Sequence, residues 1–151
     1  MVVLVSTQAG PQTAIRLVDL RETPLDVTEV VDALADPASG GLTLFVGRVR
    51  QEDGGRAVDG LDYSAHPSAL ERLREVCDRI ATKFDLHEVA AVHRTGALAI
   101  GDIAVIVATS SAHRDEAFRA SRALIDTLKA EVPIWKHQRF ADGTDEWVGT
   151  P

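Results

Sequence analysis

The sequence predicts a single α+β domain in which a mixed, mostly antiparallel sheet packs against two long helices and one short helix. Three observations support this fold class. Apolar residues recur at helical spacing in two long segments. Segments rich in β-branched residues precede and follow these helices in the sequence, and glycine-containing turns separate neighbouring strand segments. The chain has 151 residues, 45% of them hydrophobic, so one domain over residues 1–151 can bury its own core.

The first third of the chain is expected to form strands and the short helix. Its apolar start, MVVLVSTQAG, lacks a basic segment and indicates a strand rather than a signal peptide. Residues 14–20 alternate and predict a further strand. Asp26 is placed to cap a short helix over DVTEVVDALAD, and LTLFVGRVR predicts the next strand. The Gly54-Gly55 pair then suits a hairpin into a strand near residues 58–63.

Two long helices are expected, one before and one after a pair of strands in the sequence. From Pro67 to Phe84, apolar residues form a helical stripe, and Cys77 lies on it, so we interpret this cysteine as a small core residue. EVAAVHRTG and IAVIVATSS follow, and the second is a continuous apolar run typical of a central strand. The second long helix is expected over residues 114–131, and Pro133 ends it ahead of a last strand, PIWKHQRF.

Composition excludes several classes of protein. The net charge is −7 with a pI near 5.1, which argues against a general nucleic-acid binder. No apolar run is long enough to span a bilayer. A single cysteine excludes an internal disulfide framework and is compatible with a reducing cytosol, so we expect a cytoplasmic protein. Five scattered histidines show no metal-ligand spacing, and we expect neither a metal nor a cofactor.

Lysine is rare in this chain, and its placement is the main indication of chemistry. Two of three lysines, Lys129 and Lys136, lie close together in DTLKAEVPIWKHQ, whereas arginine occurs thirteen times. A desolvated lysine can shift its pKa and exchange protons, but arginine stays charged. Helical geometry places Lys129 at the edge of the buried face, partly desolvated, and alternation places Lys136 opposite Trp135. The alternative is that two ordinary surface lysines lie close together by chance.

Two further basic groups indicate an anionic ligand. His113 and Arg114 follow a buried strand at a helix start, where free N–H groups can bind an anion. Helix capping by the serines before them is an equally good interpretation. Arg48 and Arg50 share one face of a strand, with Phe45 on the other, and suit a phosphate or carboxylate. A solvated edge strand would explain these arginines as well.

Taken in order, FVGRVR, HRTG, the turn GD, SAHR followed by AF, and LKxxxPIWK with a terminal WV resemble the large, catalytic subunit of molybdopterin synthase. The resemblance runs from about residue 14 to residue 148. It implies an α/β hammerhead fold and a sulfurtransferase of molybdenum cofactor biosynthesis that converts cyclic pyranopterin monophosphate (precursor Z) to molybdopterin. It also implies a small ubiquitin-like carrier subunit with a C-terminal Gly-Gly thiocarboxylate, and a homodimer at the centre of a heterotetramer.

The resemblance further implies site residues. The catalytic pair would be Lys129 and Lys136, in general acid/base work and in stabilising negative charge. The substrate-binding residues would be Phe45, Arg48, Val49, Arg50, His113, Arg114, His137 and Gln138, with His113 and Arg114 reaching the pocket from the second copy of the dimer. The chain departs from the family at Ser64, where a glutamate is common, and at His137 and Gln138, where Lys or Arg and then Glu are usual.

Two other functions are compatible with the residues. One is a Schiff-base lysine enzyme acting on a small phosphorylated carbonyl compound. The other is a non-catalytic module that docks a ubiquitin-like tail. Borohydride trapping would distinguish the first, and tail binding without turnover would distinguish the second.

Overall fold

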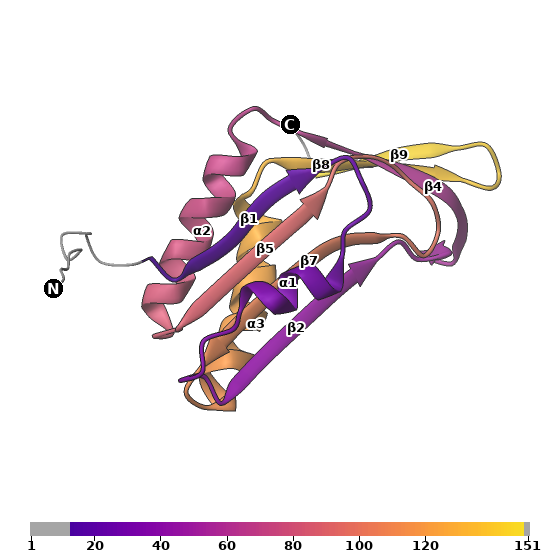
Figure 1. The fold of residues 1–151 in the computed structure, drawn as a ribbon. Coiled ribbons are helices and arrows are strands. Elements are labelled where there is room, and N and C mark those ends of the chain that lie inside the picture. Colours follow the sequence, from indigo (N-terminus) through magenta and orange to yellow (C-terminus); the bar gives the residue numbers. More distant parts are fainter. Residues whose placement is uncertain (1–12, 150–151) are drawn as a thin grey trace, which may run out of the picture.

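The computed structural model describes residues 13–149, and its strands form two sheets (Figure 1). The N-terminal strand expected in MVVLVSTQAG lies outside these residues. The first sheet has the strand order β1 (Ile15–Arg21), β5 (Glu88–Arg94), β7 (Ile103–Ser111), β2 (Gly41–Arg48). The second has the order β3 (Glu52–Asp53), β4 (Arg56–Ala65), β8 (Ile134–Phe140), β9 (Asp145–Val148), and β6 (Gly96–Leu98) also pairs with β4.

The α+β class and the mostly antiparallel pairing are confirmed. Only β1 and β5 run parallel among the pairs of the described chain, and every other pair is antiparallel. The expectation of a single sheet needs correction, because the strands divide between two. The Gly54-Gly55 turn is a two-residue hairpin between β3 and β4, and φ values of 59° and 80° explain why glycine occupies both positions.

Three helices cover the first sheet on its two faces. The long helices α2 (Ala69–Lys83) and α3 (Arg114–Glu131) pack on one face, and the short helix α1 (Val27–Ala33) packs on the other. Asp26 caps α1 as expected, since its carboxylate accepts a hydrogen bond from the N–H of Thr28 at 2.9 Å. None of these helices is long and apolar enough to cross a membrane.

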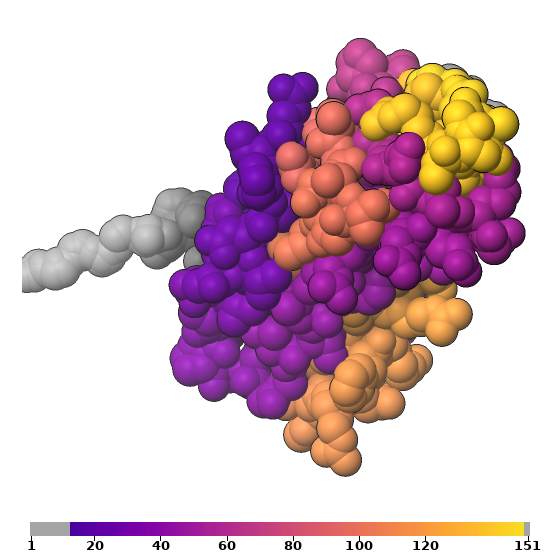
Figure 2. Space-filling model, turned by 90° about the vertical axis from the view of Figure 1, so that its right-hand side faces the viewer, coloured from indigo at the N-terminus to yellow at the C-terminus, as the bar shows by residue number. Residues whose placement is uncertain are grey.

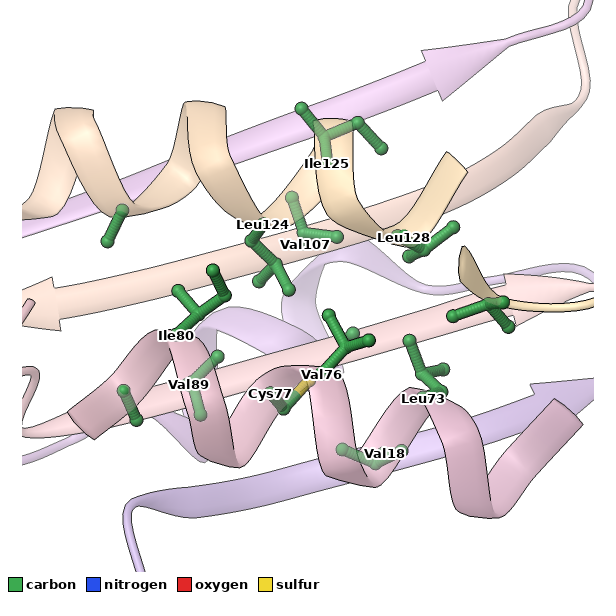
Figure 3. Close-up of a cluster of buried hydrophobic side chains, with 14 of the residues drawn as sticks. Val18, Leu73, Val76, Cys77, Ile80, Val89, Val107, Leu124, Ile125 and Leu128 are labelled. Atoms are coloured by element: carbon green, nitrogen blue, oxygen red, sulfur yellow. The ribbon is translucent and has the colours of Figure 1, made fainter. Parts of the chain in front are cut away.

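The main core lies between the long helices and the first sheet (Figure 3). Leu73 and Cys77 of α2, Leu124 of α3 and the sheet residue Val107 belong to this core, and all four are fully buried. Burial raises the pKa of the Cys77 thiol to about 12, so this side chain is a protonated core residue at neutral pH. The interpretation of the single cysteine as structural is confirmed.

The second sheet carries the C-terminal hairpin to one end of the molecule. Figure 2 shows this hairpin (yellow) packed over β4 (magenta), with the surface of α3 (orange) extending to the other end. Helix α3 ends at Glu131, and after Pro133 the chain turns back as β8 beside β4. The end of α3 and the middle of β8 are therefore brought close together, and both carry a lysine.

Candidate active site

Lys129 and Lys136 line one cavity of about 170 Å³, which we call the lysine pocket. Its wall also includes Tyr63 of β4 and His93 of β5, and its rim includes Val148 at the end of β9. Two strands from the middle of the chain and three consecutive C-terminal elements therefore contribute to one pocket. The prediction that the two lysines share a site is consistent with this geometry.

The two lysines differ in their exposure. Lys129 stands in the last turn of α3, next to the buried Leu128, and its own side chain is exposed. Lys136 pairs with Tyr63 across β8 and β4 and is half-buried. The partial desolvation expected for Lys129 therefore falls on Lys136, because Lys129 lies where the helix ends and solvent reaches it.

The pKa of Lys136 lies below its ordinary value. Burial is the main cause, and the positive charges of Lys129 and Arg50 lower it further. The carboxylates of Asp53 and Glu146 act in the opposite direction and raise it. A lysine balanced in this way can hold or release a proton nearer to neutral pH than an exposed lysine can.

Tyr63 and His93 are pocket residues that the sequence did not single out. Their rings meet edge to face, with centroids 4.8 Å apart and planes at 82°. Nδ1 of His93 donates to the carbonyl of Arg94 at 2.8 Å, because a carbonyl can only accept. Burial lowers the pKa of His93 to about 4, and burial raises the pKa of Tyr63. Both side chains are therefore neutral at pH 7.

Arg48 and Arg50 lie beside the lysines. A depression of about 380 Å³ is lined by both arginines together with Lys129 and Phe45. The expectation that Phe45 faces away from the arginines is wrong. The β2–β7 register shifts between Gly47 and Arg48, and this irregularity breaks the alternation on which the expectation rested.

Val49 and Gln138 lie in the neighbouring part of the site. Both line a cavity of about 50 Å³ that also includes Lys136. Val49 is buried, and its backbone is fixed by hydrogen bonds to Asp102 (3.0 Å) and Gly101 (2.8 Å). Gln138 is buried two residues after Lys136, on the same face of β8.

His137 lies on the opposite face of β8 from Lys136. Its ring stacks on Trp147, with centroids 4.4 Å apart and planes at 6°, and its Nε2 lies 2.5 Å from a carboxylate oxygen of Asp145. Strand alternation explains this separation. The structure thus brings Gln138 to the lysines and does not bring His137 there.

His113 and Arg114 lie at the other end of α3. The helix runs from Arg114 past Lys129. At a rise of 1.5 Å per residue, Arg114 and Lys129 are about 22 Å apart along its axis. Both side chains are exposed. Ser111 donates its hydroxyl to the carbonyl of His113, and Ser110 donates to Glu88, so these serines do not cap the helix as the alternative interpretation required. Within one chain, His113 and Arg114 do not reach the lysine pocket.

Within residues 13–149, no group of three or more His, Cys, Asp or Glu side chains could hold a metal ion. What the pocket does offer is two amines, two guanidinium groups nearby and a neutral imidazole. This arrangement can bind an anion, stabilise developing negative charge and transfer protons.

Comparison with known proteins identifies the family. A family model described as MoaE protein matches residues 20–131. The molybdopterin synthase catalytic subunit 1 of Mycobacterium tuberculosis is 45% identical over 131 residues, which cover 86% of this chain and 88% of the relative. The molybdopterin synthase catalytic subunit of Halalkalibacterium halodurans is 37% identical over 131 residues, covering 86% and 83%.

Solved structures agree with this result. A crystal structure of molybdopterin synthase from Staphylococcus aureus matches with a TM-score of 0.81 and 34% identity, covering 89% of this chain and 98% of that one. A complex of subunits 1 and 2 of molybdopterin-converting factor from Helicobacter pylori contains the same fold, with a TM-score of 0.66, 21% identity and coverage of 91% and 90%. By the family model and by these relatives, the chain belongs to the MoaE family of molybdopterin synthase catalytic subunits.

Proposed function

We propose that this chain transfers sulfur to cyclic pyranopterin monophosphate and so forms the dithiolene of molybdopterin. The observation that carries the proposal is the lysine pocket, where Lys129 and Lys136 share a cavity beside two arginines. A cyclic phosphate and a thiocarboxylate are both anions, and a basic pocket in an acidic protein suits them. Cys77 is buried and protonated, so the sulfur must come from another molecule.

In this proposal the lysines take part in the reaction and the arginines bind the substrate. Lys136, with its lowered pKa, is suited to proton transfer as sulfur adds and the cyclic phosphate opens. Lys129 would stabilise the negative charge that develops in the same pocket. Arg48 and Arg50 would bind the phosphate, which a guanidinium group can contact through two parallel hydrogen bonds.

The sulfur donor would be the C-terminal Gly-Gly thiocarboxylate of a small ubiquitin-like subunit. The H. pylori complex of subunits 1 and 2 supports a two-subunit arrangement for this chain. One wall of the lysine pocket is apolar, formed by Leu128, Val132 and Ile134, and Val148 and Gly149 line the pocket as well. Such a wall can accept the extended backbone of two glycines. The buried, unpaired thiol fits a reducing cytoplasm as the place of action.

A second copy of the chain would complete the site. β2 is an edge strand of the first sheet and exposes Leu42, Leu44 and Phe45. Phe118 of α3 is 62% exposed and joins Leu44 and Phe45 around one depression of about 510 Å³. Apolar side chains along an unpaired edge suit an isologous interface between two copies. Two such dimerised chains with two carrier subunits would make a heterotetramer.

The orientation of that interface would account for the expected role of His113 and Arg114. Gly41, at the start of β2, lies against the backbone of Arg114, whereas Arg48, at its end, lies beside the lysine pocket of the same chain. Antiparallel pairing of β2 with its copy about a two-fold axis would set the start of one strand beside the end of the other. His113 and Arg114 of one copy would then approach the pocket of the second copy.

Reconstitution with a thiocarboxylated carrier subunit and precursor Z tests the proposal. We expect dithiolene formation by the wild-type protein, and at least a ~100-fold loss in Lys136→Ala and Lys129→Ala, as for removal of a general acid or a charge stabiliser. Lys83→Ala is the matched control, because Lys83 lies on α2 outside the pocket, and it should keep full activity. Undiminished turnover in Lys136→Ala would contradict the site. Borohydride-trapped adducts on either lysine would favour a Schiff-base enzyme. Binding of the carrier subunit's C-terminal tail without any turnover would favour a docking module.

A further inference from the structure

Two carboxylates, those of Asp53 and Glu146, are held beside Lys136 by one buried amide. Gln138 donates one N–H to Asp53 Oδ2 at 2.6 Å and the other to Glu146 Oε1 at 3.0 Å. Because Gln138 lies two residues after Lys136 on β8, both side chains share one face of the strand. Gln138, which is 3% exposed, thus fixes carboxylates from β3 and β9 on the face that carries the lysine.

Asp53 is the carboxylate that acts more strongly on Lys136. It lines the same cavity of about 50 Å³ as Lys136 and Gln138, and its attraction for the ammonium group is larger than that of Glu146. The Gln138 hydrogen bond, followed by the charges of Lys136, Arg50 and Arg56, holds the pKa of Asp53 below its usual value. Asp53 is therefore ionised at neutral pH.

The hairpin fixes Asp53 where it lies. β3 has two residues, and Asp53 pairs with Arg56 across the Gly54-Gly55 turn. Arg50 contacts Asp53 Oδ1 at 3.4 Å, so the same carboxylate also faces an arginine of the site. One side chain of the hairpin is thus in contact with the amide on β8 and with the loop after β2.

We propose that Asp53 is a positioning residue for Lys136: fixed by Gln138 on the β3–β4 hairpin, its carboxylate is the counter-charge for the Lys136 ammonium group in the small cavity that both side chains line. This role rests on the proposed function, in which Lys136 transfers protons. A half-buried lysine between two other cations loses its proton easily. A fixed carboxylate opposes that loss and lets the lysine serve as a proton donor at neutral pH.

The other charges around Lys136 make Asp53 the decisive one. Lys129 from α3 and Arg50 from the loop after β2 repel the ammonium group, and Glu146 from β9 attracts it more weakly than Asp53 does. Tyr63 from β4 and His93 from β5 line the lysine pocket as neutral groups. Without Asp53, burial and two cations would lower the pKa of Lys136 and only the carboxylate of Glu146 would raise it. The pKa of Lys136 would therefore fall further.

The scarcity of lysine allows a direct test. Reductive methylation of the full chain with ¹³C-formaldehyde labels three lysines and the N-terminal amine and keeps their charge. The ¹³C shift of Lys136, assigned through Lys136→Arg, then reports its pKa. In Asp53→Asn we expect this pKa to fall by about one unit. In Asp53→Glu, which keeps a negative charge at this position of the hairpin and leaves Gln138 in place, we expect most of the fall to be absent.

Asp145→Asn is the matched control. Asp145 belongs to the β8–β9 hairpin but contacts His137 on the opposite face of β8, so its removal should leave the Lys136 titration unchanged. Lys83, on α2, serves as the internal reference within each spectrum. An unchanged Lys136 titration in Asp53→Asn, or an equal shift in Asp145→Asn, would overturn the proposal.

The titration also separates this proposal from the proposed function, because it requires no turnover. Where the wild-type protein is active, the basic limb of the pH–rate profile should lie at lower pH in Asp53→Asn by the same shift, and close to its wild-type position in Asp53→Glu. A wild-type protein that makes no dithiolene, with the titration shift present, would refute the function and leave the Asp53–Lys136 pair intact. Turnover with an unmoved titration would refute the pair alone.

Discussion

At the scale of single residues, the surroundings distinguish Lys136 from Lys129. Sequence spacing was enough to bring both into one hypothesis, because only Val132 and Pro133 separate the end of α3 from the start of β8. The spacing assigned the desolvation to Lys129, whereas the structure half-buries Lys136. Tyr63 and His93 could not be predicted as pocket residues, since their place depends on which strands of two sheets meet across the pocket.

His93 should make the stability of the protein depend on pH. Its pKa is about 4 in the folded state against the ordinary value near 6.5, so only the unfolded state binds a proton between these values. Stability therefore falls as pH is lowered through this window, by about 2 kcal/mol from His93 alone at pH 5. Urea unfolding at pH 7.5 and pH 5 measures the change, and His93→Gln should lose less stability over this interval than wild type by that amount. An equal loss in both proteins would contradict the buried neutral state.

At the scale of elements, long segments were predicted and short ones were not. The span of α3 is confirmed at residues 114–131, because an apolar stripe and Pro133 define it locally. β6 and β9 have three and four residues and exist through pairing with other strands, β6 with the distant β4 and β9 with the preceding β8. The position of Phe45 was wrong for a related reason: the shift after Gly47 is a property of the β2–β7 pair and not of β2 alone.

The β3–β4 turn should be sensitive to side chains. Gly55 has φ of 80°, a region that costs L-residues roughly 1–2 kcal/mol, and a β-branched residue is least tolerated there. We expect Gly55→Val to destabilise the protein by about that amount in urea unfolding and to raise the mobility of Asp53. Ala57→Val, at an exposed position of β4 next to the turn, is the control and should change stability by less than about 0.5 kcal/mol. Equal stabilities of the two variants would rule out strain at the turn.

At the scale of the whole molecule, two groups of the residues expected in the site lie at opposite ends of β2. The lysine pocket adjoins the Arg48 end, and His113 and Arg114 adjoin the Gly41 end. Motif order indicated that both belong to one active site, but no single chain can bring them together across about 22 Å. The exposed apolar edge between them is where a second copy would resolve this separation.

Disrupting that edge should dissociate the dimer. Leu44→Glu and Phe118→Glu place a charge within the apolar depression between β2 and α3, and burying it in an interface is unfavourable. Light scattering after size exclusion should show monomers at micromolar concentration, where we expect wild type to be dimeric. Val31→Glu is the control, because Val31 is an exposed apolar residue of α1 outside that depression. A dimer that survives both substitutions would place the interface elsewhere.

Complementation between two inactive variants tests most directly whether the active site is shared between copies. Lys136→Ala removes the pocket lysine, and Arg114→Ala removes the arginine that we propose is supplied by the second copy. Each homodimer should be inactive in dithiolene formation with the thiocarboxylated carrier. Randomly mixed subunits should recover about a quarter of wild-type activity, since only heterodimers contain a complete site and each contains one. No recovery in mixed dimers, or full activity of Arg114→Ala alone, would contradict the account.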